Sequence, residues 1–143
     1  MPVRGSFVVL LCLMLAGCLT PNTLTDRAFN SGAVRDFNGD LNQVTTAVAA
    51  AMERLPVNVS DPMPRGPDRV IDFNRPTDAH NWGEIGRVVI EPLGPNQTRV
   101  IVAVENRYKL QPTHGTEQAF ADIIFNGAER RLVQVPAGLG GSR

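Results

Sequence analysis

Apolar residues recur every three or four positions along residues 40–55, which is the pattern of a helix that buries one side. The recurring positions are Leu41, Val44, Val48, Met52 and Leu55. Asp40 and Gln43 have the spacing of a capping box at the start of this helix, and Pro56 predicts its end. Several alanines make the helix thin. It is therefore suited to close packing on a sheet or, alternatively, on a helix of a partner protein.

Alternation of apolar and polar residues predicts a pair of β-strands at 85–93 and 98–106, joined by turn residues at 94–97. One face of this pair is wholly apolar, since Val88 and Ile90 lie on it together with the valines at positions 100, 102 and 104. The other face is mixed. This pattern is typical of an antiparallel sheet with one face on the core and the other in solvent.

Shorter segments complete the predicted elements. Residues 56–60 predict an edge strand, 61–67 a proline-rich turn and 68–73 a further strand. Residues 115–132 predict a second helix. Its apolar side would consist of Ala119, Phe120, Ile123, Ile124 and Gly127.

The predicted fold class is α+β, with a small antiparallel sheet of three to four strands and two helices packed on one of its faces. The expected element order is α-β-β-β-α, within a domain at residues 40–133 that is followed by a disordered tail at 134–143. The expected core combines Val88, Ile90, Val100, Val102 and Val104 of the sheet with Leu41, Val48, Met52, Phe120 and Ile124 of the helices.

Composition narrows the class of protein. The 143 residues are 43% hydrophobic and carry 14 basic and 14 acidic side chains, so the formal net charge is zero. A nucleic-acid binder has a strong basic surplus, so nucleic acid is not an expected partner. The two cysteines are Cys12 and Cys18, so the domain after them has no disulfide and no thiolate metal site of its own.

The N-terminus has the features of an export signal. Arg4 precedes the wholly apolar residues 7–15. As a helix this run is roughly 14 Å long, about half of the ~30 Å that a membrane-spanning helix needs. The run therefore indicates the hydrophobic region of a signal peptide.

Leu15-Ala16-Gly17-Cys18 follows this run and resembles the lipobox of bacterial lipoproteins at all four positions. The resemblance implies a signal peptide at residues 1–17, cleaved by signal peptidase II, and acyl chains such as palmitate on Cys18. It also implies the periplasmic face of the cell outer membrane, because Leu19 is not the aspartate that retains such proteins in the inner membrane. The alternative is an ordinary secreted protein with a chance cysteine at this position.

Residues 18–39 would then form the lipidated cysteine and a flexible tether, since they are polar and have no sustained apolar period. The alternative is an ordered extension that packs on the domain through Phe29, Val34 and Phe37.

The domain carries few candidates for chemistry. Its two histidines, His80 and His114, have no metal-ligand spacing, and no nucleophile motif accompanies them. We expect no cofactor and no enzymatic activity. The leading hypothesis is a non-enzymatic envelope lipoprotein whose domain binds or braces another envelope protein, and Arg75, His80 and Trp82 form its predicted interface.

Two other functions stay open at this stage. One is a small periplasmic hydrolase or metal-binding domain centred on residues 78–84, with Asp78, His80, Glu84 and His114 as its polar groups. The other is a small-ligand carrier that uses the mixed face of the sheet.

Overall fold

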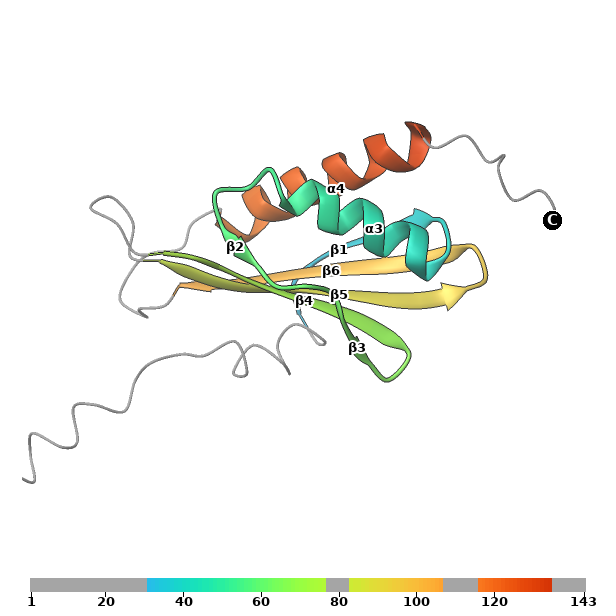
Figure 1. Cartoon of the computed structure of the whole chain (residues 1–143), viewed down its shortest axis with the longest axis horizontal. Coiled ribbons are helices and arrows are strands. Elements are labelled where there is room, and N and C mark those ends of the chain that lie inside the picture. Colours follow the sequence, from blue (N-terminus) through green and yellow to red (C-terminus); the bar gives the residue numbers. More distant parts are fainter. Residues whose placement is uncertain (1–30, 77–82, 107–115, 135–143) are drawn as a thin grey trace, which may run out of the picture.

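The computed structural model describes residues 31–76, 83–106 and 116–134. These ranges contain six strands and two helices (Figure 1). The elements are β1 (Ala33–Asn38), α3 (Leu41–Met52), β2 (Asn58–Val59), β3 (Met63–Arg65), β4 (Asp68–Arg75), β5 (Glu84–Gly94), β6 (Gln97–Asn106) and α4 (Thr116–Gln134). The predicted α+β class, with an antiparallel sheet and two helices, is confirmed.

The strands form one sheet in the order β1-β6-β5-β4-β2, in which β3 also pairs with β4, and every pairing is antiparallel. The predicted three to four strands and the α-β-β-β-α order therefore match only in part, because the described residues form six strands and β1 precedes the first helix. The first strand, β1, lies in the part of the chain assigned above to the tether, and β3 lies in the segment assigned to a turn. β1 has charged residues at its centre and β3 contains Pro64, so neither has the apolar alternation that identifies a strand.

Helix α3 begins where the sequence predicts. The Asp40 side chain accepts hydrogen bonds from the backbone N–H groups of Asn42 and Gln43, both at 2.9 Å. The Gln43 side chain accepts one from the N–H of Asp40 at 3.2 Å. This capping box satisfies N–H groups that have no partner inside the helix. The regular helix ends at Met52, ahead of Pro56.

Both helices pack on the same face of the sheet (Figure 1), and the core lies between these two layers. Every predicted core residue of β5 and β6 belongs to this buried cluster, as do Val48, Met52, Phe120 and Ile124, and Leu41 packs at its edge. The expected core is thus confirmed. The two helices approach closely at Gly127, where an added Cβ would lie 2.7 Å from the Cβ of Ala51.

The buried side of α4 differs from the prediction. Ile123 is 50% exposed and Ala119 is also exposed. The helix instead buries Phe120, Ala121, Ile124, Phe125 and Ala128. This set and the predicted one share two residues and are rotated about the helix axis relative to each other. The ring of Phe125 decides between them, because it lies 6.1 Å from the ring of Phe37 in the core.

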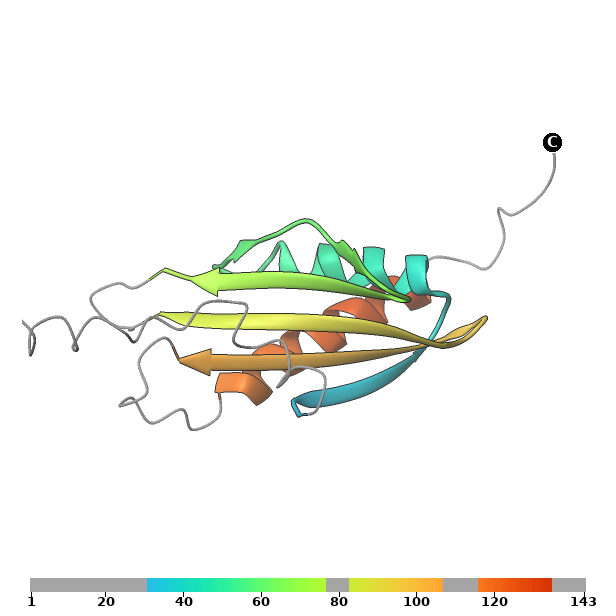
Figure 2. The same cartoon turned by 90° about the horizontal axis from the view of Figure 1, so that it is seen from below.

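The face of the sheet without a described helix, hereafter the second face, is not the solvated face that the mixed pattern predicts. Val70, Val89, Ile101 and Ala103 lie on it and are each at most 6% exposed. Figure 2 looks onto this face, with both helices behind the strands.

The predicted signal peptide (1–17), Cys18, His80, Trp82 and most of the predicted tail lie outside the described residues. What the sequence predicts for them stays a prediction.

Candidate interaction surfaces

Arg75 and Glu84 lie opposite each other at the end of the sheet from which the 77–82 connection leaves. The Nε atom of Arg75 is 3.5 Å from Oε2 of Glu84, and the side chains are 29% and 10% exposed. Neither of these two atoms makes a hydrogen bond to another described residue. A largely buried ion pair without supporting hydrogen bonds is costly to desolvate, so it contributes little net stability.

Arg75 also contacts helix α4. Its guanidinium carbon lies 5.0 Å from the centre of the Phe120 ring, which is within the range of a cation–π interaction. The Phe120 ring in turn lies 5.4 Å from that of Phe73 in the core. Arg75 therefore fixes the start of α4 to the end of the sheet, a structural role that the sequence pattern does not indicate. Its predicted neighbours in the interface, His80 and Trp82, are not among the described residues.

Two connections of the chain leave the sheet at this same end. Glu84 pairs with Asn106, the last residue of β6, so the 77–82 and 107–115 segments both start here. Glu117, near the start of α4, accepts a hydrogen bond at Oε2 from the N–H of Val104 at 3.1 Å and closes the edge of the sheet.

The metal or hydrolase hypothesis needs Asp78, His80 and His114, which lie in those two connections and outside the described residues. Glu84 is its one described member, and this carboxylate pairs with Arg75. Within the described ranges, no group of three or more His, Cys, Asp or Glu side chains is placed to hold a metal ion.

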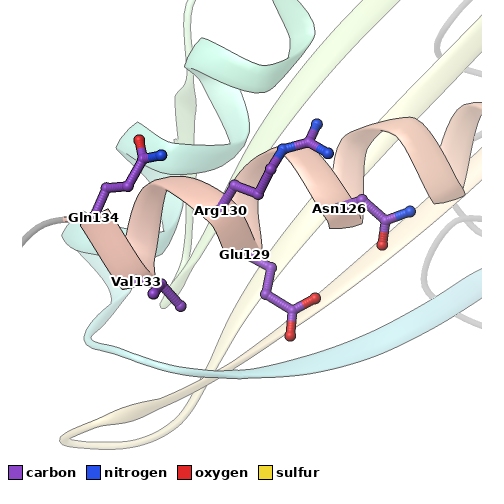
Figure 3. A pocket seen from close by; sticks show the side chains of 5 residues that line it. All are labelled: Asn126, Glu129, Arg130, Val133 and Gln134. Atoms are coloured by element: carbon purple, nitrogen blue, oxygen red, sulfur yellow. The ribbon is translucent and has the colours of Figure 1, made fainter.

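A shallow hollow of ≈ 390 Å³ lies along the outside of α4 (Figure 3). It is lined by Asn126, Glu129, Arg130, Val133 and Gln134. Ile123, Asn126, Arg130 and Val133 are three or four residues apart, so they share one side of the helix. We call Ile123, Asn126, Glu129, Arg130 and Val133 the α4 outer surface. Val133 is 80% exposed and Ile123 50%, so apolar side chains stand at both ends of it.

Arg35 of β1 borders this surface. Its Nη1 donates to Oδ1 of Asn126 at 3.0 Å and to Oε2 of Glu129 at 3.4 Å. Its guanidinium lies 5.0 Å from the centre of the Phe125 ring. These contacts hold the carboxylate and amide toward β1. The sequence pattern does not indicate this surface, because it puts Ile123 on the apolar side of the helix and ends the helix at residue 132. Phe125 is the signal that corrects the predicted apolar side.

Two bidentate ion pairs lie on the second face of the sheet. Asp72 accepts from Nε and Nη2 of Arg87 at 2.6 and 2.8 Å, and the Arg87 side chain is 5% exposed. Asp36 accepts from the same atoms of Arg99 at 2.8 and 3.0 Å, and both of these side chains are 39% exposed. The hydrogen bonds from Arg99 hold the pKa of the Asp36 carboxyl below its ordinary value of 3.8.

Among the described residues, neither helix is long and apolar enough to cross a membrane. Comparison of the chain with protein-family models and with curated proteins finds no match to either, so the surfaces above are interpreted from their own chemistry.

Proposed function

We propose that the protein is a non-enzymatic lipoprotein of the outer membrane, with acyl chains on Cys18 and its domain at the periplasmic face. The observation that carries this proposal is the order of features at the N-terminus: Arg4, the apolar run 7–15 and the sequence Leu15-Ala16-Gly17-Cys18. Each buried CH₂ contributes ~0.8 kcal/mol to membrane binding, so one acyl chain binds reversibly and two or three hold the protein on the bilayer.

Metabolic labelling with an alkyne fatty acid tests the anchor. We expect label on the wild-type protein and none on Cys18→Ser, because serine has no thiol to accept the lipid. Cys12→Ala is the matched control, since Cys12 lies inside the predicted hydrophobic region and should leave labelling unchanged. Equal label on the wild type and on Cys18→Ser would contradict the proposal.

We further propose that the domain binds another envelope protein. Two surfaces are offered for this contact: the segment around Trp82 and His80 next to Arg75, and the α4 outer surface. The exposed Val133 and Ile123 support the second surface, because large exposed apolar side chains beside charged groups are typical of protein interfaces.

Affinity capture after cross-linking in intact cells tests this contact. Trp82→Ala removes the proposed anchor of the first surface, and Ile123→Ser with Val133→Ser removes the apolar ends of the second. Loss of a specific cross-linked partner in one variant identifies the surface. If neither variant changes the captured proteins, the proposed binding role is wrong.

A further inference from the structure

The second face of the sheet carries an unbroken apolar row. Met63 lies opposite Val70, Val70 opposite Val89, Val89 opposite Ile101, and Ile101 opposite Val34. These five residues, hereafter the cross-strand stripe, come one each from β3, β4, β5, β6 and β1. The Asp72–Arg87 pair borders the stripe on one side and the Asp36–Arg99 pair on the other.

The stripe is exposed at its ends and buried in its middle. Val34 and Met63 are 54% and 47% exposed, whereas Val70, Val89 and Ile101 are 3%, 0% and 6% exposed. Arg87, next to the stripe, is also buried at 4%. Neighbouring side chains on a bare sheet shield one another in part, but a guanidinium on such a face reaches water. The middle of the second face is therefore more buried than that of a bare sheet.

The described elements do not cover the second face. Both helices lie on the opposite face, and no described helix or strand crosses in front of the second face (Figure 2). The described elements therefore do not account for the burial of the middle of the stripe.

The N-terminal segment is attached beside the stripe. The described chain begins at Ser31, three residues before Val34, and β1 stops pairing with β6 at Ala33 although β6 continues to Asn106. At Gly32 the backbone φ is 151°, and a Cβ would lie 2.7 Å from the carbonyl oxygen of Val102. This residue therefore has to be glycine, and the chain leaves the sheet edge there.

We propose that residues 19–30 lie across the cross-strand stripe and cover its middle, with Leu24 and Phe29 as the apolar contacts. The stripe crosses four gaps between strands, about 19 Å at ~4.8 Å each, which ~6 extended residues can span. Residues 19–30 number twelve, so the segment is long enough to cross the stripe. A docked segment is the ordered alternative to the flexible tether that the sequence predicts.

Docking would also limit the distance between the domain and the membrane, a consequence that rests on the proposed lipid anchor at Cys18. Twelve free residues would let the domain move up to ~40 Å from Cys18. The docked segment uses about half of that length on the domain surface and so holds the second face near the membrane. It also keeps an apolar stripe out of water.

Site-specific photo-cross-linking of the full chain in cells tests the docking. A benzophenone amino acid is placed at position 29 or, separately, at position 24, with exposed position 96 in the β5–β6 turn as the matched control. We expect cross-links within one chain from 29 or 24 to peptides containing Val70, Val89 or Ile101. Their yield should exceed that from position 96 several-fold.

The same positions are tested in Cys18→Ser, which separates the docking from the anchor. Intrachain cross-links in both backgrounds support docking even if lipidation is disproved. Cross-links from both positions that reach only α3, α4, other proteins or a second copy, the last identified with isotope-labelled chains, would overturn the inference, as would their absence.

Discussion

Gly86 is a position at which the core accepts no side chain larger than hydrogen. It lies on the helix-facing side of β5, opposite Phe73, and an added Cβ would overlap the buried Phe73 ring. We therefore expect Gly86→Ala to lower the free energy of unfolding by ~1–3 kcal/mol, the usual cost of overpacking a core. Thermal melting measures this change.

The matched control is Gly94→Ala, because a Cβ at position 94 meets no atom within 4 Å. Shrinking the ring with Phe73→Leu in the Gly86→Ala background should restore part of the loss. If Gly86→Ala has the same melting temperature as the wild type, the Phe73 ring moves aside at no cost and the packing argument is wrong.

Asp36 gives the fold a small dependence on pH. Its pKa is lowered in the folded protein by the hydrogen bonds from Arg99, so the pair contributes stability above the unfolded pKa and loses it as pH falls through the lower folded pKa. The melting temperature of Asp36→Asn should therefore be lower than that of the wild type near neutral pH. Well below pH 3.8 the two melting temperatures should be equal.

Because both side chains are 39% exposed, added salt should shrink the difference at neutral pH. Asp61→Asn, at an exposed position, is the control for removing one negative charge. A difference between wild type and Asp36→Asn that persists in acid would contradict this assignment.

At the scale of elements, close contact between α3 and α4 competes with helix propensity at Gly127. Replacing a mid-helix glycine by alanine gains ~1 kcal/mol of propensity. Here the new Cβ would lie 2.7 Å from that of Ala51, and overpacking costs ~1–3 kcal/mol. We expect the contact to win, so Gly127→Ala should lower the melting temperature.

Combining Gly127→Ala with Ala51→Gly tests this balance, since the two changes exchange the methyl group between the helices. The double variant should melt near the wild type. A single Gly127→Ala variant more stable than the wild type would show that the helices separate freely.

Elements with strong periodicity are the ones that the sequence predicts. The stripe of α3, the Asp40 cap and the valines of β5 and β6 are local signals, and all of them hold. β1 is not evident from the sequence because its central Arg35 and Asp36 look solvated, whereas each forms a hydrogen bond with a residue more than 60 positions away. Such partners are set by the fold and leave no mark on local hydrophobic pattern.

Contacts between residues far apart in the chain also explain why the sequence does not predict the candidate surfaces. The sequence favours Arg75 as an interface residue because it is near Trp82, but its contact with Phe120 depends on how α4 packs on the sheet. The burial of the middle of the second face is likewise set by the fold, because a mixed strand pattern by itself predicts a solvated face.

At the scale of the whole molecule, the prediction concerns which membrane holds the protein. The resemblance to lipoproteins places the sorting signal directly after Cys18, where this chain has Leu19. We expect the wild type in the outer-membrane fraction of a two-membrane host and Leu19→Asp in the inner-membrane fraction, because an aspartate at this place retains the lipoprotein. Density-gradient separation of the membranes measures the ratio. Leu19→Ser changes the same residue without adding a charge and should stay in the outer membrane. A wild-type protein found mainly in the inner membrane would contradict the proposed location while leaving the anchor on Cys18 intact, since the fatty-acid label reports on the lipid and the gradient reports on sorting.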